Sequence, residues 1–406
     1  MIAATLAPAQ PPPAEAAVEA FPPFRFRAAA PLQFAVHFTR GLFDPGNPLL
    51  GRTLREGPEP PPARWLCCLD AGLAAAQPEL AARIRAYAAA RPELELLHDP
   101  LLLPGGEAAK NSFEIPHKVL RLARRLHLSR QSHIVAVGGG AFLDAVGFAA
   151  ALIHRGARLV RVPSTVLAQN DSGVGVKNGL NLGGSKNFLG TFAPPAAVLA
   201  DFALLATLAD RDWIAGIAEA FKVAVIKDAA FLEWLLAHAP ALRRRDQAAM
   251  ERLIHRCATL HLEHIAAGGD PFEQGNARPL DFGHWSAHKL ESLTSHELRH
   301  GEAVALGIAL DLLVAAELGF ITAADARRVT AGLAAAGLPV RHEALGWTDP
   351  AGRPFVLQGI EEFREHLGGR LAITLPNPLG ARREIGQLDE ALLRRCLARL
   401  AAGPGG

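Results

Sequence analysis

Three parts of the sequence carry side chains that could hold a divalent metal. Glu219 and Lys222 lie three residues apart in a segment with helical spacing, so both side chains project from one face of that helix. His284 and His288 lie four residues apart and share one face of a second helix, and His300 stands at the start of a third. One carboxylate and two imidazoles from three helices would leave an open coordination position, as in catalytic zinc sites.

Spacing alone does not decide which two histidines would join Glu219. Two histidines four residues apart also occur on ordinary helix surfaces, so the pair at 284 and 288 does not prove a metal site. His261 and His264 form a further candidate pair. No motif surrounds these two, and a partly exposed helix face explains them better.

Two turns that contain glycine indicate a site for phosphate groups. Three glycines at 138–140 follow an apolar run that is typical of a strand, and a helical segment comes after them. Glycines at such a turn let the backbone come close to a pyrophosphate, whose charge then lies at the helix N-terminus. The pattern is not the GxGxxG fingerprint, and a tight turn explains a triple glycine equally well. The second turn, at 104–112, places Glu107 and Lys110 three residues apart.

The stretch 164–187 is polar although it lies between two apolar segments. We expect a long polar loop after the carboxyl end of a strand, where parallel α/β proteins build binding sites. Lys177 and Lys186, with Arg155 before them, would form a pocket for an anion. The amide side chains around them would orient phosphate or hydroxyl groups.

Alternating apolar and amphipathic segments predict a parallel α/β sheet in the first half of the chain. Strands are expected at 64–70, 133–140 and 158–164, and helices at 79–91 and from 144 to about 153. After about residue 205, long segments rich in alanine and leucine have helical spacing. They cover 210–238, 245–267, 283–294, 300–318 and 322–336, and the late stretch 370–376 is typical of a strand.

This pattern predicts two domains and a short leader. We expect a Rossmann-like parallel-sheet domain at 29–203 and a mostly α-helical domain at 204–406, with a ligand site in the cleft between them. Residues 1–28 are rich in alanine and proline and have little to bury, so we expect a flexible leader there.

The composition excludes several classes of protein. The chain has 406 residues, of which 50% are hydrophobic and 20% charged, as is typical of a globular enzyme. A formal net charge of +2 argues against nucleic acid as the main partner. Four cysteines form neither a disulfide framework nor a CxxC metal motif, which favours buried thiols in a reducing compartment. With no apolar run near the roughly 18 residues of a membrane span and no secretion signal, we predict a cytoplasmic protein without a membrane partner.

Seven sequence blocks resemble the 3-dehydroquinate synthase family of sugar phosphate cyclases. They are GGGAFLD, HRGARLVRVPSTVLAQND, GVKNGLN, GSKNFLGTFAPP, AGIAEAFK, DFGHWSAHKLE and HGEAVALGI. They occur between about Gly105 and Leu310, in the family's order and with nearly its spacing. NDSGVGVKNGLN and DPFEQGNARPLDFGHW are most similar to the EboD-type branch. The resemblance implies an NAD-binding α/β domain, a helical metal-binding domain and a homodimer.

The resemblance also implies a role for individual residues. The divalent metal, zinc or cobalt, would be bound by Glu219, His284 and His300. NAD would be held by Glu107, Lys110, Gly139, Gly140, Asp144, Ser164, Thr165, Lys177, Lys186 and Thr207. The substrate pocket would be lined by Arg155, Asp171, Lys177, Lys186, Asn187, Lys222 and His288. Within that pocket, Lys177, Asn187 and His288 would hold the departing phosphate.

The family reaction explains why one site needs a metal, NAD and a phosphate pocket. NAD takes a hydride from an alcohol of a heptulose-type sugar phosphate, phosphate is eliminated, the hydride returns, and an aldol step closes the ring. The metal acts as a Lewis acid on the alcohol and carbonyl oxygens. The resemblance therefore implies a carbon–oxygen lyase that makes no net redox change.

Several cations that would hold a substrate carboxylate in the family are missing here. The usual Arg-x-x-Leu-Asn is replaced by the residues at 277–281, which end in Asp281, and the place of a family lysine falls near Glu263. The late double-lysine block reads Arg-Glu-His at 364–366. Buried like charges are costly, so these changes disfavour a carboxylate ligand and suit hydroxyl groups. We expect a neutral-headed sugar phosphate, as in 2-epi-5-epi-valiolone and 2-deoxy-scyllo-inosose synthases.

Two other functions fit parts of the pattern. A metal- and NAD-dependent polyol dehydrogenase, similar to the glycerol dehydrogenases, would share the two-domain plan, but it has no need for a phosphate pocket at Lys177, Lys186 and Asn187. A non-catalytic binding protein would have no need for the set of metal ligands Glu219, His284 and His300.

Overall fold

A computed structural model describes residues 33–56, 61–183, 185–267, 279–366 and 368–402. The chain divides into two units, Met1–Leu32 and Gln33–Gly406, and every described residue belongs to the second unit. The leader that the sequence predicts at 1–28 lies outside the described residues, as do Ala277 and Arg278.

A parallel sheet occupies the first half of the unit. Its strands are β1 (Ala35–Thr39), β2 (Ala63–Asp70), β3 (Leu94–Leu96), β4 (Leu101–Leu103), β5 (His133–Gly138), β6 (Arg158–Pro163) and β9 (Ala197–Asp201). They follow the order β1-β9-β6-β5-β2-β3, with β4 also beside β2, and each pair is parallel. The strands expected at 64–70, 133–140 and 158–164 are β2, β5 and β6, which confirms the predicted α/β class.

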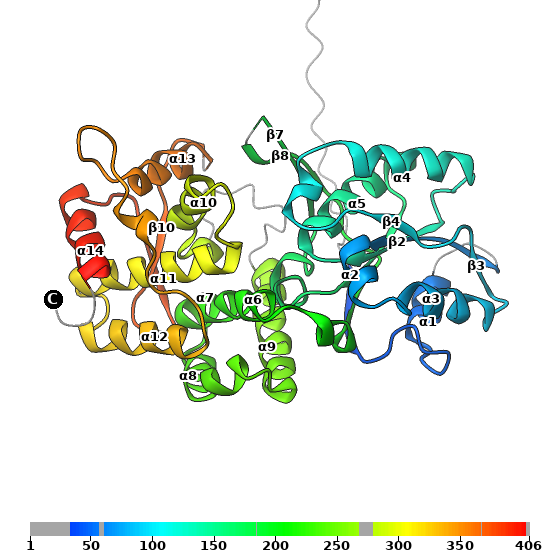
Figure 1. Cartoon of the computed structure of the whole chain (residues 1–406), viewed down its shortest axis with the longest axis horizontal. Helices are drawn as coiled ribbons and strands as arrows, with labels where there is room; N and C mark the ends of the chain where they lie inside the picture. Colours follow the sequence, from blue (N-terminus) through cyan, green and yellow to red (C-terminus); the bar gives the residue numbers. More distant parts are fainter. Residues whose placement is uncertain (1–32, 57–60, 184, 268–278, 367, 403–406) are drawn as a thin grey trace, which may run out of the picture. The chain divides into compact units, whose positions relative to one another are not determined.

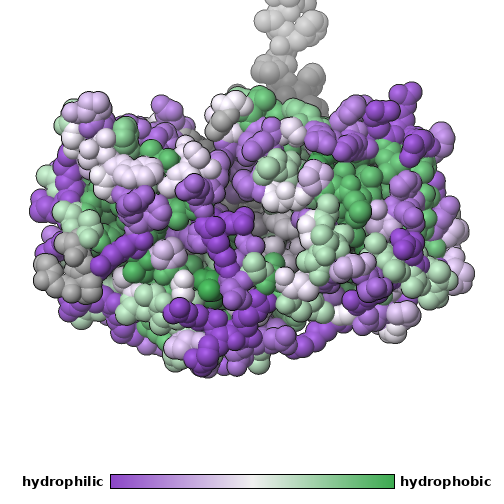
Figure 2. All heavy atoms as spheres, in the orientation of Figure 1, coloured by the Kyte–Doolittle hydropathy of each residue, from purple (hydrophilic) through white to green (hydrophobic). Residues whose placement is uncertain are grey.

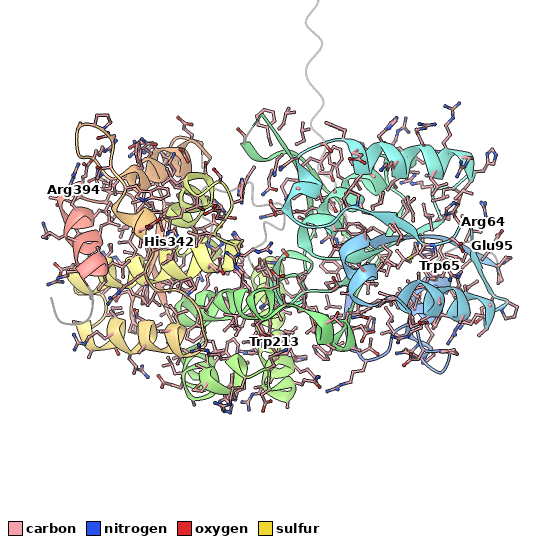
Figure 3. All side chains as sticks on the ribbon, viewed as in Figure 1. Arg64, Trp65, Glu95, Trp213, His342 and Arg394 are labelled. Atoms are coloured by element: carbon pink, nitrogen blue, oxygen red, sulfur yellow. The ribbon has the colours of Figure 1, made fainter. Side chains whose placement is uncertain are left out.

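Helices cover both faces of this sheet (Figure 1). They are α1 (Leu49–Arg55), α2 (Ala71–Ala76), α3 (Leu80–Ala89), α4 (Glu114–Arg125) and α5 (Gly140–Leu152), with short turns η1 (Glu107–Lys110), η2 (Ile153–Arg155) and η4 (Phe202–Thr207). Successive side chains of a strand point to opposite faces. Leu66 and Cys68 of β2 therefore pack with α4 and α5. Trp65, which is labelled in Figure 3, and Cys67 pack with α1 and α3.

The polar stretch 164–187 is not the long loop that the sequence predicts. It contains a π-helical turn, η3 (Ala168–Ser172), and runs into an antiparallel hairpin of β7 (Lys177–Leu182) and β8 (Ser185–Phe192). Every residue of β8 is exposed or only partly buried. A strand with no buried face lacks the alternation of apolar residues that marks strands in a sequence, so this hairpin was not predictable from its pattern.

The second half is mostly helical, as predicted. Its elements are α6 (Asp210–Ala215), α7 (Ile217–Lys227), α8 (Ala229–Arg243), α9 (Gln247–Ala267), α10 (His284–Leu293), α11 (His300–Glu317), α12 (Ala323–Ala335), α13 (Gln358–His366) and α14 (Glu390–Ala402). Between them lie the turns η5 (Pro279–Asp281), η6 (Glu343–Gly346) and η7 (Phe355–Leu357), and the antiparallel pair β10 (Ile373–Pro376) and β11 (Arg382–Ile385).

The segment 210–238 is divided among α6, α7 and the start of α8, where the sequence predicts one helix. The first break is at Gly216, where a Cβ atom would lie 2.6 Å from the Val166 side chain and the Leu167 backbone nitrogen. The second is at Asp228, whose carboxylate accepts a hydrogen bond of 2.9 Å from the Phe231 N–H and so caps α8. Glu219 thus lies in the first turn of its own helix, α7.

Buried apolar side chains hold the helices together. Trp213 of α6 is buried and donates from Nε1 to the carbonyl oxygen of Leu242 in α8, at 2.8 Å (Figure 3). Hydrophilic side chains gather over the part of the surface where α6, α8 and α9 lie (Figure 2). Among the described residues, no helix combines the length and the apolar character needed to span a bilayer.

A buried carboxylate joins α11 to the start of α10. Asp311 accepts hydrogen bonds from Trp285 Nε1 at 2.8 Å and from the Gly283 N–H at 3.0 Å. Burial raises the pKa of Asp311 to about 7, although both hydrogen bonds oppose the shift.

The raised pKa of Asp311 predicts a loss of stability as the pH rises. Below the pKa of an unfolded aspartate, Asp311 is protonated in both states and its contribution is complete. As the pH rises toward 7, the native state keeps a proton that the unfolded state releases, so the free energy of unfolding falls. Relative to Asp311→Asn, we expect the native chain to lose about 3 kcal/mol between pH 5 and pH 8 in urea unfolding. A constant difference between the two proteins over this range would contradict the shift.

Candidate active site

Glu219, His284 and His300 converge at one point between three helices. Glu219 lies in the first turn of α7, and the two histidines are the first residues of α10 and α11. Glu219 Oε1 is 3.7 Å from His284 Nε2 and 3.5 Å from His300 Nε2. Within the described part of the chain, this buried oxygen has no hydrogen-bond partner. One donor atom of each residue lies within 4.8 Å of the others, which fits a zinc or cobalt ion.

The geometry separates the histidines that spacing left undecided. His288 lies beside the group, with its ring centroid 5.5 Å from that of His284 and 6.0 Å from that of His300. It belongs to a second set of possible donors, together with Glu291 and His300. Neither set, among the residues described, includes His261 or His264.

Glycines let the helices that carry these histidines pack closely. Gly283, which precedes His284, has a φ of +77°, and a Cβ atom there would lie 2.9 Å from the backbone nitrogen of Ile308. A Cβ atom at Gly301, which follows His300, would overlap the carbonyl oxygen of Ala215. A larger residue at either position would displace a histidine from Glu219.

Lys222 lies one helical turn after Glu219 and faces two carboxylates. Its ammonium group contacts Glu219 Oε2 and lies 3.7 Å from Asp171 Oδ1. Burial alone would lower the pKa of Lys222, but Asp171 and Glu219 raise it above its usual range. Burial would raise the pKa of Glu219, but Lys222 lowers it to about 2. The two carboxylates therefore favour the protonated form of Lys222, which can donate hydrogen bonds at this point.

Asp171 connects the α/β half to the helical half. It belongs to η3, and its Oδ1 is 3.2 Å from His261 Nδ1 on α9, in addition to its contact with Lys222. Its neighbour Asn170 donates from Nδ2 to the carbonyl oxygen of Gly216 at 2.7 Å. His261 therefore contacts the Asp171 side chain. The sequence analysis had considered His261 as a possible metal ligand.

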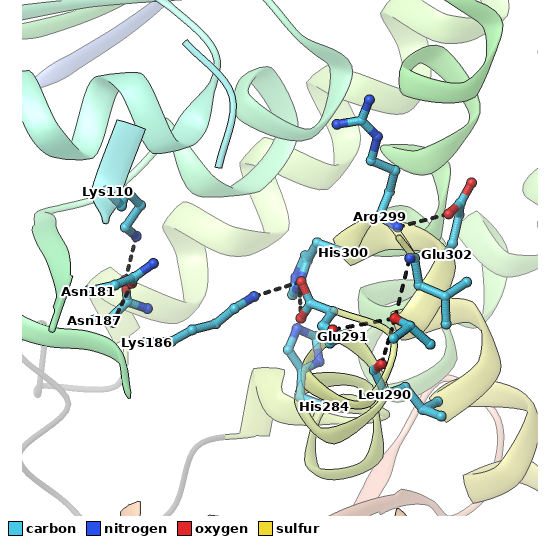
Figure 4. Close-up of polar contacts among 12 residues, drawn as sticks. Lys110, Asn181, Lys186, Asn187, His284, Leu290, Glu291, Arg299, His300 and Glu302 are labelled. Carbon is cyan, nitrogen blue, oxygen red and sulfur yellow. Dashed lines mark hydrogen bonds and ion pairs between the residues drawn. The ribbon is translucent and has the colours of Figure 1, made fainter. Parts of the chain in front are cut away.

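Glu291 is a site residue that the sequence analysis missed. Its side chain is 3% exposed, and its Oε2 lies 3.1 Å from His300 Nδ1 (Figure 4). Its Oε1 accepts a hydrogen bond of 2.7 Å from Lys186 Nζ, which reaches it from β8. Burial would raise the pKa of Glu291, but His300 and Lys186 lower it well below its usual range. Its position three residues after His288 and seven after His284, on the same helix face, was the available signal.

The residues expected to hold NAD follow the carboxyl ends of parallel strands. Such ends meet at one edge of a sheet, which is where α/β folds bind nucleotides. Gly139 and Gly140 follow β5, Ser164 and Thr165 follow β6, Glu107 and Lys110 follow β4, and Thr207 ends the turn after β9. A Cβ atom at Gly140 would overlap the Ser172 hydroxyl group, so only glycine leaves this turn open for a close backbone approach.

Polar contacts tie Lys110 to the hairpin and to α5. The buried Lys110 ammonium group is 2.7 Å from Asp144 Oδ2 and also contacts Asn187 Oδ1 (Figure 4). Asn187 is exposed and has a φ of +52°. Asn181, on the other strand of the hairpin, accepts through Oδ1 from the Asn187 N–H at 2.9 Å.

Other predicted residues contribute less to this cluster. Thr207 Oγ1 accepts a hydrogen bond of 3.0 Å from Gln77 Nε2, and Thr165 Oγ1 accepts one of 3.1 Å from the Ala168 N–H. Ser164 is buried, whereas Glu107 and Lys177 are exposed.

The structure does not bring Arg155 to the site within one chain. Arg155 follows α5 and precedes β6, so it lies at the amino end of that strand, while Ser164 follows its carboxyl end. These two ends lie at opposite edges of the sheet. The anion pocket of Arg155, Lys177 and Lys186 that the sequence predicts is therefore not formed by one chain.

The structure describes some of the residues that the sequence predicts to distinguish between substrates. The negative charge of Asp281 also raises the pKa of Lys222. This effect is smaller than the effects of burial, Asp171 and Glu219. Glu263 has a side chain that is 57% exposed and lies 4.0 Å from Arg256 Nη1. Arg364 pairs with Glu361 on its own helix, at 2.8 Å.

Comparisons of sequence agree with this arrangement. The family model of the 3-dehydroquinate synthase N-terminal domain matches residues 100–215, and that of the C-terminal domain matches residues 216–352. The 3-dehydroquinate synthase of Paracoccus denitrificans (strain Pd 1222) is 39% identical over 305 residues, which cover 74% of this chain and 81% of that protein. The 3-dehydroquinate synthase of Ruegeria sp. (strain TM1040) is 37% identical over 285 residues, with 70% and 75% covered.

Solved structures share the fold. ValA, a 2-epi-5-epi-valiolone synthase from Streptomyces hygroscopicus subsp. jinggangensis 5008 with NAD+ and Zn2+ bound, is 29% identical, with a TM-score of 0.82 and 93% and 99% of the two chains covered. A 2-deoxy-scyllo-inosose synthase is 21% identical, with a TM-score of 0.72 and 90% and 96% covered. A probable glycerol dehydrogenase from Sinorhizobium meliloti 1021 is 20% identical, with a TM-score of 0.58 and 91% and 96% covered. The last two likenesses concern the fold alone. With both family models matched and this level of identity to curated relatives, the chain belongs to the 3-dehydroquinate synthase family of sugar phosphate cyclases.

Proposed function

We propose that this chain closes a ring in a heptulose-type sugar phosphate that lacks a carboxylate, with NAD and a divalent metal as cofactors. The observation that carries the proposal is the position of Lys186. Its ammonium group reaches the carboxylate of Glu291, which contacts His300, so a cation suited to a leaving phosphate lies beside the candidate metal ligands. A simple dehydrogenase has no use for this cation.

Glu219, His284 and His300 would hold the metal, which when bound polarises alcohol and carbonyl oxygens as a Lewis acid. All three offer their donor atoms to one point. If His300 donates from Nδ1 to Glu291, its Nε2 atom, which lies 3.5 Å from Glu219 Oε1, would be free to bind a metal held by both residues. The relative ValA contains Zn2+, and a 2-deoxy-scyllo-inosose synthase of the same fold contains Co2+.

NAD would lie along the carboxyl edge of the sheet, where it supplies a hydride acceptor that is regenerated in each turnover. The turn at 139–140 would face its pyrophosphate at the start of α5. Lys110, held by Asp144, would add a positive charge to the same edge. Ser164, Thr165, Glu107 and Thr207 are proposed to complete the site.

The remaining polar residues would bind and orient the sugar phosphate. Lys222, which contacts Glu219 and lies 3.7 Å from Asp171, would donate a hydrogen bond to a substrate oxygen. Lys177, Lys186, Asn187 and His288 would surround the phosphate that leaves. Arg155 could reach this pocket only from another copy of the chain.

Asp281 favours a substrate with a neutral head group. Its negative charge acts on Lys222, inside a cluster that already contains Asp171 and Glu219. A substrate carboxylate placed there would meet uncompensated like charge, which costs several kcal/mol in a buried site. Hydroxyl groups would instead donate hydrogen bonds to Asp281.

A comparison of two substrates tests this specificity. With NAD and zinc present, we expect kcat/KM for sedoheptulose 7-phosphate to exceed that for 3-deoxy-arabino-heptulosonate 7-phosphate by at least about 100-fold. Asp281→Asn should narrow the ratio because it removes the negative charge but keeps the size of the side chain. Preference for the carboxylate-bearing substrate would contradict the assignment and make this chain a 3-dehydroquinate synthase in activity as well as in family.

The homodimer, the cytoplasmic location and the EboD-type branch are also proposals. Three hydrophobic residues of the β7–β8 hairpin support a protein contact there, because Leu182, Phe188 and Phe192 are 48%, 66% and 51% exposed. Sedimentation of the purified chain as a monomer at micromolar concentration would contradict the dimer.

A further inference from the structure

The carboxylate of Glu291 divides its two oxygens between two partners that come from different parts of the fold. Oε1 accepts from Lys186 Nζ at 2.7 Å, and Oε2 lies 3.1 Å from His300 Nδ1 (Figure 4). Lys186 belongs to the β7–β8 hairpin, and His300 begins α11. A buried carboxylate needs charged or hydrogen-bonding partners, and both of these partners are cations or donors.

The contact with His300 would set how this imidazole meets a metal. A histidine that donates from Nδ1 to a carboxylate has a fixed ring orientation and presents a more basic Nε2 atom. Here that Nε2 atom points to Glu219 Oε1, 3.5 Å away. Glu291 is therefore placed to hold His300 in the orientation that the candidate metal site requires.

The contact with Lys186 connects the same carboxylate to the proposed phosphate pocket. The Lys186 ammonium group has three donors, so it can contact Glu291 and a phosphate oxygen in turn or together. A bound phosphate would compete with Glu291 for the hydrogen bonds of Lys186. With a weaker contact to Lys186, Glu291 would accept a stronger hydrogen bond from His300. A tighter bond to His300 Nδ1 makes Nε2 a better metal ligand.

We propose that Glu291 is a positioning residue that couples phosphate binding at Lys186 to metal binding at His300. This inference rests on the proposed function, because it takes Lys186 as a ligand of the substrate phosphate. Coupling between two binding sites is reciprocal, so phosphate should tighten metal binding by the same factor by which metal tightens phosphate binding.

The test measures metal affinity, with inorganic phosphate as the probe. Zn2+ affinity of the full chain is measured by competition with a chelating dye, with and without saturating inorganic phosphate, and the absorption spectrum of the Co2+ form reports the ligand geometry. Glu291→Gln keeps the size of the side chain and removes its charge. We expect this variant to bind Zn2+ about 10- to 100-fold more weakly, to show a shifted Co2+ spectrum, and to lose the phosphate response.

Two further variants keep the test independent of folding. Lys186→Gln keeps the Glu291–His300 contact but removes the cation that competes for Glu291. It should therefore bind Zn2+ about as tightly as the phosphate-saturated native chain does and should show no further response to phosphate. Glu362→Gln is the matched control. The Glu362 side chain is 56% exposed and lies 2.6 Å from the ammonium group of Lys289, which is on α10 like Glu291. This variant should behave as the native chain in all three measurements.

Two results would overturn the inference. One is a folded Glu291→Gln protein with native Zn2+ affinity and Co2+ spectrum. The other is a native chain whose Zn2+ affinity does not respond to phosphate. Neither depends on turnover, so a chain that shows the coupling but cyclises no sugar phosphate would refute the proposed function and leave the role of Glu291 standing.

Discussion

Glu219→Gln will lose its bound metal and at least about 10³-fold in turnover of its sugar phosphate. Glu219 is the only carboxylate in the described donor set with His284 and His300, and it is fully buried. Glutamine keeps the shape but removes the charge that holds a divalent cation. The metal supplies several kcal/mol of transition-state stabilisation, and each 1.36 kcal/mol is a factor of ten in rate. Metal analysis of the purified protein and phosphate release measure the two losses.

The control for this variant changes the same chemical group at a remote place. Glu233 on α8 pairs with Arg328 at 2.6 Å, and its side chain is 59% exposed. Glu233→Gln should keep native metal content and native turnover. Native turnover in a metal-free Glu219→Gln protein would contradict the assignment of this cluster.

Lys222→Met will reduce the free energy of unfolding of the metal-free chain by about 3–5 kcal/mol at pH 7. The substitution leaves two carboxylates, Glu219 and Asp171, in a buried site without the ammonium group that now contacts both. Added zinc should recover part of the loss because a divalent cation replaces the missing charge. Urea unfolding with and without a chelator measures both effects.

The pH dependence of this loss has a defined sign. Lys222 keeps the pKa of Glu219 at about 2 and helps to hold the pKa of Asp171 well below its usual range, both against burial. Lowered carboxylate pKa values contribute stability at neutral pH, and this contribution disappears as the pH falls through them. In Lys222→Met the same carboxyl groups protonate at higher pH, so the gap to the native chain should narrow at pH 4.

A second lysine gives the matched control. Lys289 is mostly buried, but its partner Glu362 is 56% exposed. Lys289→Met should therefore cost less than about 1 kcal/mol. Equal losses in the two variants would show that the carboxylates near Lys222 are not held as the structure indicates.

Much of the fold was predictable because buried elements leave periodic patterns. Strands β2, β5 and β6 lie inside the sheet and are rich in apolar residues, although β6 also contains the buried Arg161. The helices of the second half repeat their apolar residues at helical spacing. The breaks at Gly216 and Asp228 were not predicted, because they depend on the close approach of Val166 and on a cap. The domain boundaries at 28/29 and 203/204 stay predictions.

The site residues that belong to sequence motifs were predictable. The site residues that are defined only by their contacts in the fold were not. Spacing indicated the helices of Glu219, His284 and His300, but the choice among the histidines needed either the resemblance or the distances. Glu291 was missed because its helical spacing to His284 and His288 does not by itself show that it contacts His300 and Lys186. Both the cluster of cations in the sequence and the resemblance placed Arg155 in the site, whereas one chain places it at the other edge of the sheet.

The balance of products from one incubation distinguishes a sugar phosphate cyclase from a dehydrogenase. The chain is supplied with NAD, zinc and sedoheptulose 7-phosphate, and released phosphate, cyclic product and NADH are measured together. For a cyclase we expect equal amounts of phosphate and cyclic product, with no accumulation of NADH beyond the amount of enzyme. NADH that accumulates with an oxidised, uncyclised sugar and no free phosphate would contradict the cyclase and indicate a polyol dehydrogenase.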